Sequence, residues 1–104
     1  MLILVFRYVT MFFVEVDLMI RIWAKVMKDH KIVKQYIFEK FEVIDYSKFY
    51  DYLVEICENL DIPTPVLIKT HLFNYAKYNN VRFGESDFVE SIDFDKLVLE
   101  NAFL

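Results

Sequence analysis

Cysteine, glycine and proline are scarce in this sequence of 104 residues, which contains one Cys, one Gly and two Pro. The single cysteine, Cys57, excludes an internal disulfide bond and a zinc site built from several thiolates. The single glycine, Gly84, excludes the glycine-rich loops that bind phosphate groups. So few glycines and prolines also disfavour an all-β protein, because tight turns between strands depend on these residues.

Basic residues are in the minority as well, since 12 Lys and Arg stand against 16 Asp and Glu, which gives a net charge of −4. Proteins that bind a phosphate backbone rely on clustered Lys and Arg, so we expect nucleic acid to be a poor partner. The composition is nevertheless rich in core-forming side chains, with 57% hydrophobic and 18% aromatic residues. This content predicts a folded protein, and the length predicts one domain.

Residues 1–18, MLILVFRYVTMFFVEVDL, form a strongly apolar stretch. A transmembrane helix and a secretory signal are both disfavoured, because Arg7 interrupts the stretch and no small-residue cleavage site follows. An additional buried strand or helix is an open alternative. We favour the hypothesis that translation starts at Met19, because residues 14–19 can be encoded by codons that contain a purine-rich ribosome-binding sequence. We therefore expect an extension over 1–18, one domain over 19–104, and no membrane attachment.

A β-hairpin is predicted at the start of this domain. Apolar and more polar side chains alternate from Ile20 to Lys28, which is typical of a strand with two distinct faces. The polar pair Asp29-His30 separates this run from Lys31–Phe41, which is rich in Ile, Val, Tyr and Phe. The second run has apolar side chains in both alternating phases, so its buried face stays open and a β-bulge is possible.

A helix is predicted after the hairpin. Asp45 or Ser47 can cap its first turn by accepting a backbone N–H, and the helix should end near Asp61, since Pro63 cannot continue it. Its inward face repeats at steps of three and four residues. That face consists of Phe49, Leu53, Ile56 and Leu60, widened by Tyr52 and Cys57.

The remaining elements are shorter. Val66–Ile68 is a brief apolar run, and Thr70 can cap a second helix that extends to about Asn79. Val81–Phe83 is predicted to be a short strand, and the tail from Phe88 to Phe103 should supply one or two more. The inward residues of the second helix are expected to be Leu72, Tyr75 and Ala76.

These elements together predict an α+β fold in the order ββαβαββ. We expect one antiparallel sheet with an N-terminal hairpin, and two helices that pack on one of its faces.

Several segments are similar to a known family. They are residues 19–25 (MIRIWAK), Glu55-Ile56-Cys57, Pro65 before an apolar run, Arg82-Phe83, and residues 88–95 (FVESIDFD). On these residues the chain from Met19 to Glu100 resembles a family of short uncharacterised proteins from clostridia and related bacteria, whose members begin at the equivalent of Met19. The resemblance implies a bacterial cytoplasmic setting and transfers no catalytic residue. The segment Phe41–Tyr46 departs from it, being more apolar than the acidic loop expected there.

The residue types that carry chemistry point to structural roles. Cys57 lies on the apolar stripe of the first helix and is expected to be a core residue. His30 should be a solvated turn residue and His71 a partly exposed helix residue, and neither has a second ligand at a metal-binding spacing. The carboxylates from Glu85 to Asp95 are expected to form a solvated acidic face, with a cation site or an acid–base pair as alternatives. We therefore predict no catalytic, cofactor-binding or metal-ligating residue and no cofactor.

The candidate contact surface is Trp23 with its neighbours Arg21 and Lys25, on the more polar phase of the first strand. Trp23 could instead pack under a helix or against a neighbouring strand. The leading hypothesis is a small non-enzymatic protein-interaction or regulatory module that binds an unidentified protein partner or itself. A small ligand-binding or enzymatic domain that uses carboxylates is one alternative. Another is weak nucleic-acid binding through the basic hairpin, with Arg21, Lys25, Lys28, Lys31 and Lys34.

Overall fold

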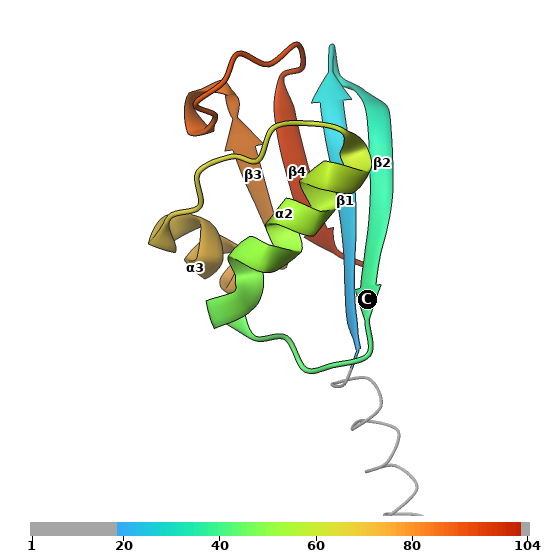
Figure 1. Cartoon of the computed structure of the whole chain (residues 1–104), viewed down its shortest axis with the longest axis vertical. Coiled ribbons are helices and arrows are strands. Elements are labelled where there is room, and N and C mark those ends of the chain that lie inside the picture. Colours follow the sequence, from blue (N-terminus) through green and yellow to red (C-terminus); the bar gives the residue numbers. More distant parts are fainter. Residues whose placement is uncertain (1–18, 103–104) are drawn as a thin grey trace, which may run out of the picture.

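The computed structural model describes residues 19–102, which form one antiparallel sheet with two helices on one of its faces (Figure 1). The strands are β1 (Ile20–Lys28), β2 (Lys31–Lys40), β3 (Asn80–Gly84) and β4 (Lys96–Asn101), in the spatial order β2-β1-β4-β3. The helical elements are η1 (Tyr46–Lys48), α2 (Phe49–Leu60), α3 (Lys69–Tyr78) and η2 (Glu85–Asp87). The predicted α+β class is confirmed, whereas the predictions for residues 1–18 lie outside the described residues.

The β1–β2 hairpin turns through two residues, as predicted. Asp29 and His30 both adopt left-handed backbone conformations, with φ of 51° and 65°. Two such residues make the mirror-image turn whose twist matches that of the flanking strands. The Asp29 N–H donates to the Asp95 carboxylate at 2.8 Å, and the Asp95 N–H donates to the carbonyl of Met27 at 2.8 Å. The hairpin tip is therefore held by the segment that leads into β4.

The register of β2 decides which of its two apolar phases is buried. Phe38 lies opposite Ile22 on β1, and both side chains are buried beneath the helices. The pairing shifts by one residue near the hairpin tip, where Val33 is the extra residue of a β-bulge. Ile37 and Ile32 lie opposite residues that face away from the helices, so one apolar phase of β2 is turned toward solvent.

Asp45 caps η1, the short turn that leads into α2, whereas α2 itself begins after Lys48 with no side-chain cap. The Ser47 hydroxyl and backbone N–H donate to the Asp45 carboxylate at 2.6 and 3.0 Å, and they lower the pKa of that carboxyl. Asp61 ends α2 in a left-handed conformation, with φ of 55°. The ammonium group of Lys34 on β2 donates to the carbonyl of Leu60 at 3.0 Å. This cation interacts favourably with the partial negative charge at the C-terminal end of α2. The contact also connects α2 to the edge strand of the sheet.

The second helix differs from the prediction in its cap and its buried face. It begins at Lys69, and the N–H of Ile68 is accepted by the His71 ring and not by Thr70. His71 is only 7% exposed, so the expectation of a partly exposed histidine was wrong. Ala76 is exposed, because α3 packs on β3 through the positions of His71 and Tyr75, one helical turn apart.

The apolar run Val66–Ile68 is an extended connection between the helices and joins no strand of the sheet. Pro63 and Pro65 both precede it, and neither has an N–H to donate. The Val66 N–H donates instead to the carbonyl of Asp87 at 2.8 Å. The predicted order places a β element between the two helices. The structure has instead a loop at this position, which is held by the hydrogen bond to Asp87.

The core lies between the helices and the sheet, where α2 crosses the strands in front of β1 and β4 (Figure 1). It is rich in aromatic contacts, such as that between Phe49 of α2 and Tyr75 of α3, whose ring centroids are 5.1 Å apart. The largest fully buried side chains include Phe38, Phe49, Phe83, Ile22, Leu53, Ile56, Leu97 and Leu99. Between residues 19 and 102, no helix has the length and apolar content needed to cross a membrane.

Candidate interaction surface

Neither described helix lies on the second face of the sheet, because α2 and α3 both pack on the opposite side (Figure 1). Strand alternation determines which side chains it carries, since residues between the buried positions point the other way. We call this surface the open face. Its members are Arg21, Trp23, Lys25 and Met27 of β1, Ile32, Gln35, Ile37 and Glu39 of β2, Lys96, Val98 and Glu100 of β4, and Asn80 and Arg82 of β3.

Apolar side chains run along β1 and β2 on the open face. Trp23 lies directly opposite Ile37, and Met27 lies opposite Ile32. Ile37 is 44% exposed and Ile32 is 42% exposed, while Trp23 and Met27 are half-buried. These four residues are called the apolar strip below. Large apolar side chains left this accessible on a rigid strand are the kind of group that anchors protein contacts.

The Trp23 side chain is held in a defined orientation. Its indole N–H donates to the Gln35 side chain at 3.0 Å. The ammonium group of Lys25 lies 4.2 Å from the ring centroid, which places a cation over the indole. Trp23 therefore lies on the open face beside a neighbouring strand and not under a helix. A role in contacting a partner stays a prediction.

The other two predicted contact residues form ion pairs between strands. Arg21 lies 3.6 Å from Glu39 of β2, and Lys25 lies 3.5 Å from Glu100 of β4. Surface pairs of this kind contribute about 0–1 kcal/mol, so a partner's carboxylate can replace one at little cost. None of the ion pairs found between residues 19 and 102 includes Lys96 or Arg82, the remaining cations of this face.

The outer edge of β2 has backbone groups that no described strand uses. The carbonyl of Arg21 accepts the N–H of Ala102 at 3.0 Å, so odd-numbered residues of β1 bond to β4 and even-numbered ones bond to β2. In β2 the bonded positions are likewise even-numbered up to the bulge. Gln35, Ile37 and Glu39 consequently direct their N–H and C=O groups away from the sheet, where another strand could pair.

The edge formed by β3 is less accessible. The N–H of Gly84, at one end of β3, already donates to the Asp87 carboxylate at 2.9 Å. The strand is also only 5 residues long, against 10 for β2. Of the two sheet edges, that of β2 is therefore the longer and more open.

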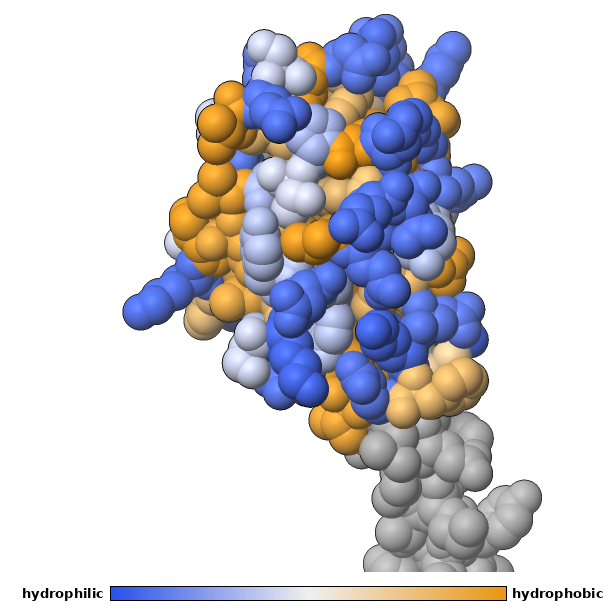
Figure 2. All heavy atoms as spheres, viewed as in Figure 1, coloured by the Kyte–Doolittle hydropathy of each residue, from blue (hydrophilic) through white to orange (hydrophobic). Residues whose placement is uncertain are grey.

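A second apolar surface lies on the helix side of the molecule. In Figure 2 hydrophobic residues gather along the left, over α3 and the segment that leads into it, while α2 is covered mainly by hydrophilic residues. The exposed members are Val66, Ile68 and Phe73, which we call the α3 patch. The ammonium group of Lys77 lies 5.5 Å from the Phe73 ring centroid. This patch was not anticipated from the sequence, because the predicted order places a β element at the apolar run Val66–Ile68.

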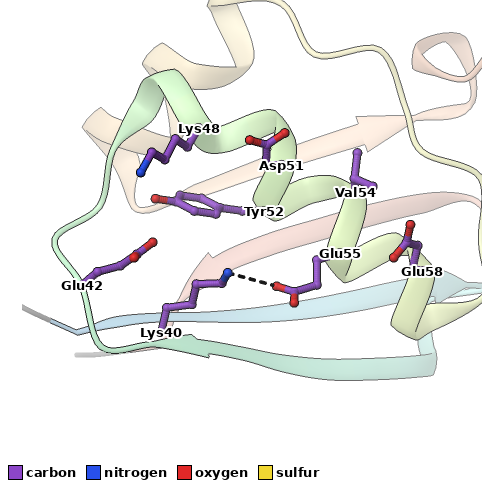
Figure 3. A pocket seen from close by; sticks show the side chains of 8 residues that line it. All are labelled: Lys40, Glu42, Lys48, Asp51, Tyr52, Val54, Glu55 and Glu58. Carbon is purple, nitrogen blue, oxygen red and sulfur yellow. Dashed lines mark ion pairs between the residues drawn. The ribbon is translucent and has the colours of Figure 1, made fainter.

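A shallow pocket of about 480 Å³ opens between α2 and the end of β2 (Figure 3). Lys40 and Glu55 point toward one another across it and are 3.8 Å apart, and the hydroxyl of Tyr52 accepts the N–H of Asp45 at 3.2 Å. The lining is largely charged, which differs from the mainly apolar lining of most small-molecule sites. The lining residues are Lys40, Glu42, Lys48, Asp51, Tyr52, Val54, Glu55 and Glu58.

The acidic residues do not converge on a cation site within the described residues, where no group of three or more His, Cys, Asp or Glu is placed to hold a metal. The segment from Glu85 to Asp95 forms η2 and a loop, so its carboxylates do not share one strand face. Asp87 and Asp95 instead accept backbone N–H groups from Gly84 and Asp29. These two carboxylates therefore stabilise turns.

The pair His71–Asp87 links α3 to the turn after β3. The Nδ1 atom of His71 accepts the N–H of Ile68 at 3.1 Å, which places the ring proton of the neutral imidazole on Nε2. Nε2 lies 3.4 Å from the Asp87 carboxylate, and the ring packs on Phe83 with centroids 4.5 Å apart. Both ring nitrogens are thus occupied by protein groups, and neither is directed at a substrate.

The Cys57 thiol is fully buried. Burial raises its pKa to about 11, an effect that a side-chain hydrogen bond with Thr64 partly offsets. Nucleophilic cysteines need a lowered pKa and access to solvent, so the geometry favours the predicted core role.

The cations of the basic hairpin do not form one strip. Arg21 and Lys25 lie on the open face and are paired with carboxylates. Lys34 lies on the helix side and donates to the end of α2. Lys28 and Lys31 flank the turn at the hairpin tip. Because these charges are divided between two faces, the hairpin lacks the continuous groove that a nucleic-acid strand requires.

No protein-family model, curated protein or solved structure matches the chain. The resemblance to short clostridial proteins stays a prediction, and no functional assignment comes from a relative.

Proposed function

We propose that this protein is a small non-enzymatic interaction module that binds a partner protein through the open face and the adjacent edge of β2. The observation that carries the proposal is the exposure of Ile37 and Ile32, at 44% and 42%, beside the oriented ring of Trp23. A rigid sheet presents these side chains without further ordering, which lowers the entropic cost of binding. The backbone groups of Gln35 and Ile37, which pair with no described strand, add a second means of attachment.

The side chains that could act in catalysis are already engaged in contacts within the protein, and this supports a binding function over a catalytic one. His71 uses both ring nitrogens within the protein, and Cys57 is buried as a thiol of raised pKa. Lys40 and Glu55 neutralise each other in the pocket beside α2. The proposal includes a cytoplasmic location, which the lone unpaired Cys57 supports, because secreted domains of this size commonly depend on disulfide bonds.

The test compares two substitutions that introduce the same charge on different surfaces. Ile37→Asp disrupts the apolar strip, and Phe73→Asp disrupts the α3 patch. Each variant and the original chain are immobilised and incubated with an extract of the cells in which the protein naturally occurs. Bound proteins are then crosslinked and quantified by mass spectrometry. Circular dichroism spectra establish that both variants are folded.

We expect a defined set of proteins to be retained by the original chain and by Phe73→Asp but lost from Ile37→Asp. Light scattering of the purified chain, over a range of concentrations, reports self-association through the same residue. The proposal would be overturned if only Phe73→Asp lost the retained proteins. It would also be overturned if all three proteins retained the same set equally and the purified chain were monomeric.

A further inference from the structure

Resting on the proposed function, we infer that the partner presents an acidic segment, with carboxylates about five residues from an apolar side chain. The apolar side chain contacts the apolar strip on β1 and β2. The carboxylates contact Arg82 and Lys96 on β3 and β4. The occupant is thus identified by charge and by spacing, and both properties follow from the register of the sheet.

The open face has the opposite charge to the rest of the protein. Of the 12 cations and 16 carboxylates, Arg7, Glu15 and Asp17 lie outside the described residues, which leaves 11 cations and 14 carboxylates, a net charge of −3. The open face has the cations Arg21, Lys25, Arg82 and Lys96 against the carboxylates Glu39 and Glu100, a net charge of +2. The remaining surface therefore has a net charge of −5. An acidic segment is attracted to the open face and repelled elsewhere, so charge alone orients its approach.

Arg82 and Lys96 are placed to receive carboxylates. Arg82 lies opposite Val98 and Lys96 lies opposite Gly84, so the two cations are close neighbours on adjacent strands. Arg82 is exposed, and no ion pair between residues 19 and 102 includes either cation. A guanidinium group can bind a carboxylate through two parallel hydrogen bonds, which gives this position geometric selectivity.

The spacing follows from the strand order. Ile37 on β2 and Arg82 on β3 are separated by three strand intervals, since β1 and β4 lie between them. At about 4.8 Å per interval, the two residues are about 14 Å apart across the strands. Ile37 is level with Asn80 of β3, so Arg82 is also displaced by two residues, about 7 Å, along the strand direction. The two positions are therefore about 16 Å apart. An extended chain advances about 3.3 Å per residue, so about five residues cover that distance. A bound segment that crosses the strands can therefore contact both ends of the face.

A nucleic-acid strand is also anionic, but the open face lacks its second requirement. Binding of single strands uses aromatic rings that are free to stack on bases. The Trp23 ring has the Lys25 ammonium group over it, and its N–H is bonded to Gln35. Glu39 and Glu100 would also lie against the phosphates. A protein segment fits this surface better, and nucleic-acid binding becomes an outcome of the test.

The experiment selects ligands without assuming their identity. A phage-displayed library of random dodecapeptides is panned against the immobilised full chain, and selected peptides are synthesised for fluorescence-anisotropy titration. We expect enrichment of Asp and Glu at about five positions from a large apolar residue. Binding should weaken by about tenfold or more in the double variant Arg82→Glu/Lys96→Glu. It should change less than about twofold in Lys48→Glu/Lys77→Glu, a matched charge change outside the open face.

The outcomes separate this inference from the proposed function. Selection of neutral or basic peptides that still lose affinity for Ile37→Asp would overturn the acidic segment and leave the interaction module intact. Equal loss in both double variants, or displacement of the peptides by a uridine 20-mer, would also overturn the acidic segment. The proposed function itself would be overturned if no peptide were selected, or if the selected peptides bound Ile37→Asp with unchanged affinity.

Discussion

At the scale of single residues, His71 and Cys57 carry the side chains with the widest range of chemistry, and both are buried in contacts within the protein. The imidazole of His71 caps α3 through Nδ1 and faces Asp87 through Nε2, so it joins a helix to a turn. Cys57 contributes volume to the core and is not exposed at all. His71 and Cys57 thus act as structural connections within the fold.

The raised pKa of Cys57 predicts a loss of stability in alkaline solution. Because the folded-state pKa, about 11, exceeds the ordinary value of 9.0, folding favours the neutral thiol. Its contribution is complete below pH 9 and is lost as the pH rises toward 11, to an extent of about 2–3 kcal/mol. Urea denaturation at several pH values between 8 and 11 should show this decline in the free energy of unfolding.

The matched control is Cys57→Ala, which should have a shallower decline over the same pH range. Burial also raises the pKa of Tyr75, but that residue is present in both proteins and cancels in the comparison. The thiol of the original chain should also react slowly with a disulfide reagent at pH 8 until urea unfolds it. Fast reaction in the folded state would contradict the core assignment.

At the scale of elements, adjacent residues of β2 have different roles, because one side chain lies in the core and the next lies on the open face. Phe38 is 1% exposed beneath α2, whereas Ile37 is 44% exposed on the open face. We expect Phe38→Ala to lower the free energy of unfolding by about 3–5 kcal/mol, through lost burial and a cavity. Ile37→Ala should lower it by less than about 1 kcal/mol, because its side chain is already largely in water. Urea denaturation of both variants measures the difference.

Similar losses at both positions would mean that something covers the open face in solution. Dilution then distinguishes a second copy of the chain from another part of the same chain. Destabilisation by Ile37→Ala that disappears at low concentration indicates association, since binding to the folded state raises its apparent stability.

At the scale of the whole molecule, the buried cluster is supplied by residues between Ile20 and Leu99. This cluster is large enough to predict that a chain beginning at Met19 folds without residues 1–18. Thermal unfolding followed by circular dichroism should show one cooperative transition for that chain, within about 5 °C of the full-length protein. A chain from Met19 that aggregates or lacks a transition would contradict the predicted domain boundary.

Much of the fold was accessible from local patterns. The hairpin, the cap at Asp45 and the end of α2 near Asp61 each depend on residues close together in sequence. Val66–Ile68 was harder, because an apolar run of three residues is equally compatible with a strand and with a loop. The open face was predicted only in part, since the polar phase of β1 indicated that Trp23 lies on the side opposite the buried residues.

The remaining parts of that surface depend on contacts distant in sequence. Nothing near Ile37 indicates that its phase of β2 faces solvent, because the choice depends on the register with β1 and on the bulge at Val33. The link between His71 and Asp87, and the approach of Arg82 to Lys96, require β3 and β4 to pair.

The sequence by itself determined the class of the protein, since alternation and helical periodicity are local consequences of side-chain direction along the backbone. The tertiary structure alone decided which face of the sheet is open and which charges gather there. The physical reason is that strand register and helix placement are settled by burying the largest apolar area, a property of the whole chain that no single segment contains.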